Sequence, residues 1–215
     1  MVIDFSKQQS VISVYMAEMR DVTLQKDPMR FRRNLERIGT HIGFEISRKL
    51  EYERRDITTP LGIAQADVLK EQPVIATILR AGLPLHNGLL QVFDFAENGF
   101  ISAYRKHHKD GSFEVFVDYM ACPLLDDKVL ILCDPMLATG TSMVMTYQAL
   151  LRRGRPKHVH IVTAIASVAG VEYTKRNMPE NVTIWTGAID EELTAQSYIV
   201  PGLGDAGDLA YGAKV

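Results

Sequence analysis

The sequence predicts an α/β fold with a doubly wound, mostly parallel sheet flanked by helices. Short apolar runs recur at 74–79, 99–104, 129–133, 158–166 and 182–185, with helical patterns between most of them. Runs that are short and apolar throughout are typical of strands buried on both faces of a parallel sheet. Right-handed crossovers then bring the carboxyl ends of such strands to one edge, where ligands bind.

Composition limits the protein to one globular domain. The chain has 215 residues, of which 47% are hydrophobic and 23% charged, and its formal net charge is −2. We expect a single domain over 1–215, with N-terminal helices and an arm in 1–70, the core sheet in 71–187 and a binding tail in 188–215. The near-neutral charge gives no electrostatic basis for general nucleic-acid binding.

Apolar runs and cysteines indicate the compartment. No apolar run approaches the roughly 18 residues that a membrane-spanning helix needs, and the N-terminus lacks the apolar core of a signal peptide. Cys122 and Cys133 lie in or beside apolar stretches without metal-like spacing. We therefore expect buried, reduced thiols, no membrane partner and a cytoplasmic location.

The N-terminal region predicts one strong helix. Asp27-Pro28 supplies a capping acid and a first-turn proline, and apolar residues follow at helical spacing to about Leu50. Four arginines on its polar face are interpreted as a solvated surface, with RNA or an anionic effector as the alternative. The arginines are Arg30, Arg32, Arg33 and Arg37.

Residues 56–68 alternate between apolar and polar side chains around Pro60 and predict a hairpin or arm suited to a subunit contact.

Two strands end at arginines. The run 74–79 ends at Arg80, followed by Ala81-Gly82, where a glycine lets the backbone approach a ligand closely. A guanidinium there can grip two phosphate oxygens at once, although an ordinary surface arginine is the alternative. The run 99–104 ends at Arg105, and a polar turn then leads into the alternating strand 113–119. This hairpin could fold over a site and exclude water.

The stretch 128–153 is the centre of the predicted site. The apolar run 129–133 ends at Asp134, small and hydroxyl residues fill 138–142, and a helical pattern follows. Such a loop directs backbone N–H groups and the positive end of a helix at one point, which suits a phosphate. Asp134 can accept hydrogen bonds from sugar hydroxyls, so the acid and the phosphate loop together suggest a ribose 5-phosphate as ligand. An ordinary turn remains the alternative, and the loop has no lysine for a Walker A motif.

The tail carries a glycine-rich loop. Gly202, Gly204 and Gly207 match the dinucleotide pattern G-x-G-x-x-G, but the match lies behind Pro201 and eight residues before the last residue. That leaves no room for the strand–helix–strand unit which the pattern requires. The exposed backbone of such a loop instead suits the edge of a small planar amide such as uracil. A glycine-rich turn with solvated acids is the alternative.

Histidine pairs do not predict a metal site. His107 and His108 are adjacent, so on an extended chain their side chains point apart. His158 and His160 share one strand face, but the sequence offers no third ligand nearby. We therefore expect no metal held by these histidines.

These motifs together resemble the type I phosphoribosyltransferases. Residues 129–142 are similar to the phosphoribosyl-pyrophosphate (PRPP) motif, and 134–140 resemble its form in the uracil phosphoribosyltransferases. Residues 78–83 resemble the family's pyrophosphate loop, Tyr104-Arg105 matches a Tyr-Arg pair at the base of its flexible loop, and 198–208 resembles its uracil-binding signature. Thr141 departs from the family, which often has glycine there. The resemblance covers about 75–208 and is loose in the N-terminal helix.

The resemblance implies transfer of the 5-phosphoribosyl group from PRPP to uracil, giving UMP and pyrophosphate. It implies Mg²⁺ held mainly by PRPP and water, and a homodimer. The alternatives are a PRPP-dependent transferase for another nucleobase and an RNA-binding regulator on the same scaffold. The implied catalytic residues are Asp134 and Arg105. The implied PRPP-binding residues are Arg80, Arg105, Asp134, Pro135, Met136, Leu137, Ala138, Thr139, Gly140, Thr141, Ser142 and Asp205, and the implied uracil-binding residues are Ile199, Gly204, Asp205 and Ala206.

Overall fold

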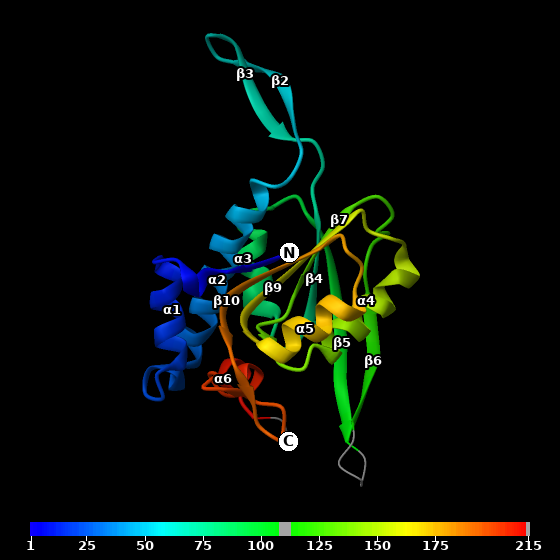
Figure 1. The fold of residues 1–215 in the computed structure, drawn as a ribbon. Coiled ribbons are helices and arrows are strands. Elements are labelled where there is room, and N and C mark those ends of the chain that lie inside the picture. Colours follow the sequence, from blue (N-terminus) through cyan, green and yellow to red (C-terminus); the bar gives the residue numbers. More distant parts are fainter. Residues whose placement is uncertain (108–112, 214–215) are drawn as a thin grey trace.

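The computed structural model describes residues 1–107 and 113–213, with the side chains of 103–117 outside that description. Its described strands form a main eight-stranded sheet in the order β1-β10-β9-β7-β4-β5-β6, with β8 paired beside β9 (Figure 1). The pairs are parallel except for β5 and β6, which confirms the predicted mostly parallel α/β fold. The strands are β1 (Val2–Asp4), β4 (Val74–Leu79), β5 (Glu97–His107), β6 (Phe113–Ala121), β7 (Val129–Cys133), β8 (Met136–Leu137), β9 (His158–Ser167) and β10 (Val182–Asp190).

Helices cover both faces of this sheet. One buried cluster joins the first three helices to strand residues such as Ile75, Ile131 and Val162. The other joins the next two helices to the alternating residues Leu130 and Ile161. Burial on both faces explains why the strand runs are apolar throughout. The helices are α1 (Val11–Arg20), α2 (Pro28–Ser47), α3 (Leu83–Leu90), α4 (Thr141–Leu150), α5 (Val168–Asn177) and α6 (Ala206–Tyr211), with 3₁₀ turns η1 (Phe5–Lys7), η2 (Leu24–Lys26) and η3 (Leu151–Arg153).

The start of α2 follows from its sequence. The Asp27 carboxylate accepts hydrogen bonds from the backbone N–H groups of Met29 and Arg30, at 3.0 and 3.1 Å. Pro28 occupies the first helical position, where its missing N–H costs nothing. Each apolar position of the predicted pattern inside the helix, from Phe31 to Ile46, is buried.

The chain after β7 differs from the expectation in one detail. The strand ends at Cys133, as the proline predicts. The carbonyl of Pro135 then accepts hydrogen bonds from Ala164 and Ile165, and pairing resumes as the two-residue strand β8. The beginning of the predicted phosphate loop is therefore fixed to β9.

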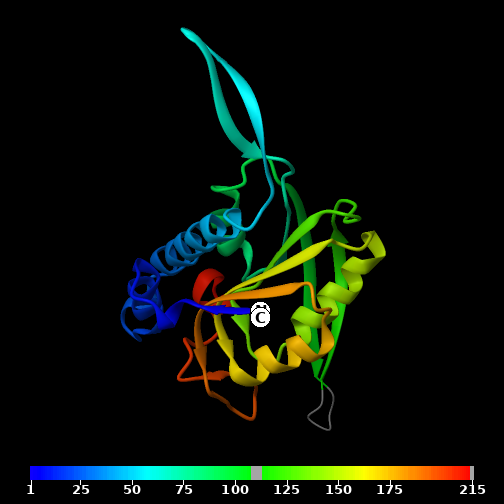
Figure 2. The ribbon, with the colours of Figure 1, turned by 45° about the horizontal axis from the view of Figure 1, so that its top comes forward.

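The hairpin of β2 (Tyr52–Thr59) and β3 (Gly62–Leu69) projects from the body of the protein (Figures 1 and 2). Within the described chain its two strands pair with each other and not with the main sheet. Most of its residues are exposed, so it is an arm.

Strand β1 was not predicted from the sequence, and the first of the expected N-terminal helices had no predicted bounds. Strand β1 adds a parallel edge to the sheet beside β10, and α1 packs against α2. At the other end, β11 (Glu192–Leu193) pairs with β12 (Ile199–Val200), and α6 follows and contacts α2. No helix in the described ranges is long and apolar enough to cross a bilayer.

Candidate active site

A cleft of about 890 Å³ lies at the carboxyl edge of the sheet. It is bounded by the ends of β4 and β7, by the loop that leads into α4, and by the tail around α6. This is the edge at which open α/β sheets bind ligands. The residues singled out from the sequence that line it are Arg80, Asp134, Met136, Leu137, Ala138, Thr139, Gly140, Ser142, Asp205 and Ala206.

The loop before α4 is held by its packing against α5. Gly140 adopts a φ of +79° as the residue before the helix, and a Cβ there would lie 2.8 Å from the carbonyl oxygen of Gly170. The Ser167 hydroxyl donates to the carbonyl of Ala138 at 2.5 Å and accepts from the N–H of Gly170 at 2.8 Å. These contacts fix the loop while the first-turn N–H groups of α4 have no acceptor within the helix. The arrangement suits an anion such as phosphate.

Asp134 stands at the end of β7 on the cleft wall. Its backbone N–H donates to the carbonyl of Val162, so the residue continues the line of the sheet. Its carboxylate accepts a hydrogen bond from the N–H of Met136 at 3.1 Å. This bond orients an acid beside the phosphate loop, where it can accept from hydroxyl groups of a ligand.

Arg80 links β4 to the tail. The Leu79–Arg80 peptide bond is cis. The guanidinium Nη2 donates to the Asp208 carboxylate at 3.1 Å and to the carbonyl of Gly212 at 2.8 Å. Its Nε is buried with no hydrogen-bond partner in the described part of the chain. The cation therefore lies in the cleft wall while it is tied to α6.

Arg105 and its neighbour Tyr104 lie in β5. The backbone of Arg105 pairs with Val115 of β6, and β5 and β6 are antiparallel, as the two strands of the predicted hairpin require. Both side chains lie outside the described residues, as do the side chain of His107 and all of residues 108–112, including His108. The predicted role of Arg105 therefore stays a prediction.

The tail contributes its first helical turn to the cleft. Asp205 caps α6 by accepting from the N–H of Asp208 at 3.0 Å, and Ala206 is only 1% exposed on the cleft wall. Ile199 instead belongs to the hydrophobic core, and Gly204 sits outside the lining with a φ of +91°.

Pro135 and Thr141 also lie outside the cleft lining. The carbonyl of Pro135 is bonded to β9, and the Thr141 hydroxyl accepts from that of Thr139 at 3.1 Å. A tight turn that was not predicted from the sequence also forms part of the cleft wall. The carbonyl of Thr194 accepts from the N–H of Ser197 at 2.8 Å, and Gln196, Ser197 and Tyr198 face the cleft. The polar run between two apolar segments was the available signal.

A smaller cavity of about 370 Å³ lies at the opposite edge of the sheet and contains both His158 and His160. The indole N–H of Trp185 donates to His160 Nδ1 at 3.0 Å. Burial, with the neighbouring His158, lowers the pKa of His160 to about 3. No cluster of three metal-ligating side chains occurs in the described ranges. His158 and His160 are therefore held by hydrogen bonds to residues of the neighbouring strand β10.

The two cysteines are buried and unpaired. Burial raises the pKa of the Cys133 thiol to about 12, so this thiol stays protonated and unreactive.

The four arginines of α2 make contacts within the chain, and two of them, Arg30 and Arg33, pair with acids. Arg30 forms an ion pair with Glu18 at 2.6 Å, and Arg32 donates to a backbone carbonyl of α6 at 2.6 Å. The partners of Arg32, Arg33 and Arg37 are Ala210, Glu36 and Asn34, respectively. All four side chains are thus engaged within the chain, and two of the four charges are compensated, which weakens the basis for RNA binding at this surface.

The sequence matches known proteins over nearly its whole length. The profile of the family described as uracil phosphoribosyltransferase matches residues 6–213. A uracil phosphoribosyltransferase of Porphyromonas gingivalis is 53% identical over 214 residues, which covers 100% of this chain and 99% of the relative. One from Methanothermobacter thermautotrophicus is 39% identical over 188 residues, covering 86% and 85%.

Solved structures show the same fold. The AQ2163 protein from Aquifex aeolicus has a TM-score of 0.88 at 29% identity, and the match covers all of both chains. A hypoxanthine phosphoribosyltransferase from Staphylococcus aureus has a TM-score of 0.52 at 14% identity, covering 75% of this chain and 76% of that one. The second likeness concerns the fold alone.

Proposed function

The chain belongs to the uracil phosphoribosyltransferase family, and from that premise we infer that it transfers the 5-phosphoribosyl group of PRPP to uracil. The products are UMP and pyrophosphate. One observation carries the inference: a single cleft at the carboxyl edge of the sheet is lined by Arg80, Asp134, Thr139 and Ala206. A cation, a sugar-facing acid, a phosphate loop and a tail for the base are the groups that this reaction needs.

The reaction is a displacement at the anomeric carbon of ribose. A bond forms from N1 of uracil to this carbon while the bond from the carbon to pyrophosphate oxygen breaks, and the N1 proton is lost. The ribose gains positive charge in the transition state, and the Asp134 carboxylate can accept from its hydroxyl groups and stabilise that charge. Residues 138–142 would hold the 5-phosphate, and the tail would hold uracil in line, so that positioning supplies much of the rate.

The leaving pyrophosphate carries high negative charge. Arg80 lines the cleft and is a candidate for its stabilisation, and Arg105 is the second predicted cation. We infer that Arg80 exchanges its present bond to Asp208 for a bond to the ligand when PRPP binds. The unpartnered Nε of Arg80 in the described chain supports this role.

The residues of the cleft fit a magnesium ion that enters with PRPP. Asp134 and Asp205 offer carboxylate oxygens, which Mg²⁺ prefers, while the described side chains form no closed metal cage. Both acids are therefore candidates to hold the ion, directly or through water. When bound, the ion would neutralise charge on the leaving pyrophosphate.

The test is formation of UMP from uracil, PRPP and Mg²⁺, followed by chromatography. We expect UMP with uracil and little product with cytosine, hypoxanthine or adenine, and loss of turnover in excess chelator. Product from another base but not from uracil would refute the proposed substrate and favour the other-nucleobase alternative. Retention of RNA at physiological salt would revive the regulator alternative.

We also infer that the protein is a cytoplasmic homodimer. Buried free cysteines support the cytoplasmic location. The arm exposes apolar side chains, with Leu61 100% and Ile63 74% exposed, and an isolated hairpin is marginal in water. A second copy of the chain would cover it. Sedimentation should give a dimer that weakens in the double variant Leu61→Ser/Ile63→Ser, and a monomer for the unmodified chain would refute the inference.

A further inference from the structure

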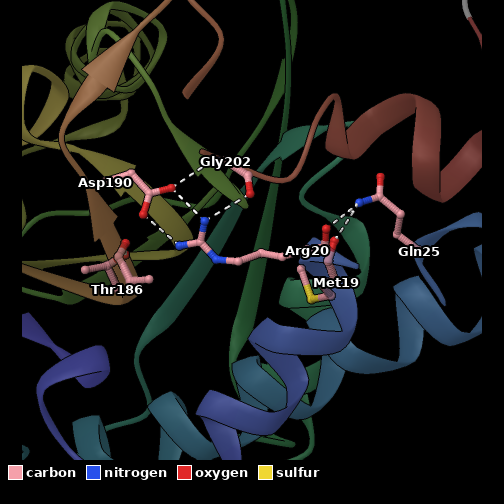
Figure 3. Close-up of polar contacts among 7 residues, drawn as sticks. Met19, Arg20, Gln25, Thr186, Asp190 and Gly202 are labelled. Atoms are coloured by element: carbon pink, nitrogen blue, oxygen red, sulfur yellow. Dashed lines mark hydrogen bonds and ion pairs between the residues drawn. The ribbon is translucent and has the colours of Figure 1, made fainter. Parts of the chain in front are cut away.

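An ion pair joins the N-terminal helix to the tail across 170 residues of sequence (Figure 3). Arg20 is the last residue of α1, and Asp190 is the last residue of β10. The two guanidinium Nη atoms donate to the two carboxylate oxygens of Asp190, each at 2.7 Å. Such two-point geometry fixes direction as well as distance.

The same pair holds both backbone groups of Gly202. Its N–H donates to Asp190 at 2.8 Å, and its carbonyl accepts from Arg20 at 3.0 Å. Gly202 has a φ of +61°, and a Cβ there would lie 2.0 Å from the carbonyl oxygen of Ile199. Any other residue would clash at this position, so the turn requires glycine. The ion pair holds that turn through both backbone groups of Gly202.

The pair is shielded from water. The Asp190 side chain is 8% exposed and that of Arg20 is 25% exposed. Burial alone would raise the pKa of the Asp190 carboxyl, but the bonds from Arg20 and Gly202 outweigh burial and hold the pKa below its ordinary value. The pair is therefore fully charged at neutral pH. Removal of one partner would leave a charge without compensation.

Gly202 lies close in sequence to the tail residues predicted to bind the base. Gly202 lies two residues before Gly204 and four before Ala206, which lines the cleft. Gln25 brings the N-terminal segment close to the same region of the tail. Its side-chain amide donates to the carbonyls of Met19 and Arg20, each at 3.2 Å. Its side-chain oxygen would lie 3.8 Å from a Cβ placed on Gly204.

We propose that Arg20 and Asp190 are positioning residues for the nucleobase: their ion pair holds Gly202 so that the tail backbone at 205–207, which lines the cleft, meets the edge of uracil. The inference rests on the proposed function. Within the described residues neither side chain lines the cleft, so the pair acts through the tail. Loss of the pair therefore affects the base more than PRPP, whose predicted loop is held independently by α5.

The test uses two variants and a matched control. Arg20→Lys keeps the charge but loses the two-point geometry, and Asp190→Asn keeps the shape but loses the charge. Arg30→Gln is the control, because Arg30 of α2 pairs with Glu18 of α1 at 2.6 Å and its hydrogen bonds and ion pair involve no tail residue. Steady-state kinetics are measured with uracil and with PRPP as the varied substrate, and melting temperatures show that each variant folds.

We expect Asp190→Asn to raise the KM for uracil by roughly tenfold or more, since charged hydrogen bonds are lost. The KM for PRPP should stay within about twofold, Arg20→Lys should be intermediate, and Arg30→Gln should leave both unchanged. Equal shifts in both KM values, or the same shift in the control, would overturn the proposal and leave a purely structural ion pair.

A second readout does not need turnover. Amide hydrogen exchange at 203–207 should be faster in Asp190→Asn and Arg20→Lys than in the unmodified chain and in Arg30→Gln. Unchanged exchange in both variants would overturn the proposal even if the unmodified chain failed to make UMP. An active unmodified enzyme whose variants keep a normal KM for uracil would overturn the positioning role and leave the proposed function intact.

Discussion

Replacement of Gly140 by alanine tests how the predicted phosphate loop is held. The structure gives two separate costs for this change. Gly140 has a φ of +79°, a left-handed conformation that costs an alanine about 1–2 kcal/mol. In addition, the new Cβ would lie 2.8 Å from both the carbonyl oxygen of Gly170 and the hydroxyl of Thr174. The displacement of these groups in α5 adds about 1–3 kcal/mol.

Two other glycines separate the costs. Gly212 has a φ of +84° and a ψ of 160°, a conformation nearly restricted to glycine, with open space around its Cβ position, so Gly212→Ala carries a conformational cost without a clash. Gly62 lies in open space without a positive φ, so Gly62→Ala carries neither cost. We therefore expect losses in the free energy of unfolding of about 2–5 kcal/mol for Gly140→Ala, about 1–3 for Gly212→Ala and within about 0.5 for Gly62→Ala.

Urea unfolding measures these three free energies, and kinetics on the folded variants measure the KM for PRPP. We expect Gly140→Ala to raise that KM by roughly tenfold, because the loop must shift away from α5, and Gly62→Ala to leave it unchanged. If Gly140→Ala is no less stable than Gly212→Ala and binds PRPP normally, the packing of the loop against α5 is not what positions it.

The remaining predictions concern single side chains. Asp134→Asn should fold normally yet lower kcat/KM by roughly 100-fold or more, because the amide stabilises ribose charge poorly; a rate near that of the unmodified enzyme would refute the role. Ala206→Leu should abolish uracil binding in calorimetry while PRPP still binds, since Ala206 is buried on the cleft wall. The pKa of His160 falls from 6.5 to about 3 on folding, so the unfolded chain binds more protons between these values and stability drops as the pH is lowered through this window. His160→Gln should remove up to about 1.4 kcal/mol per pH unit from that slope in urea unfolding, and an unchanged slope would contradict the assigned pKa.

Local patterns carried much of the fold and the cleft. The apolar run before Asp134, the proline after it and the small loop before α4 predict strand, loop and helix because each feature acts on its own backbone. The carboxyl ends of parallel strands share one edge, so Arg80 and Asp134 could be placed together before any coordinates. The tail motif likewise placed Ala206 at the site.

Backbone detail within these motifs was harder to predict. The motif at 198–208 contains both Ile199 and Ala206, yet Ile199 packs in the core and Ala206 lines the cleft. Pro135 and Thr141 belong to the loop motif but lie outside the cleft lining. Direction depends on the turn geometry of each residue, which residue type alone does not determine.

By itself, the sequence determined the order of the main strands and helices between 74 and 185, the phosphate loop and the glycine-rich tail, because these depend on residues close together in the chain. Only the tertiary structure decided that Arg20 pairs with Asp190 and thereby holds Gly202. Such a contact depends on how α1 packs beside the end of β10, and any of the chain's 24 lysines and arginines could have paired with that acid in an unfolded chain. Packing of the whole molecule selects one of them, and a linear pattern carries no record of that selection.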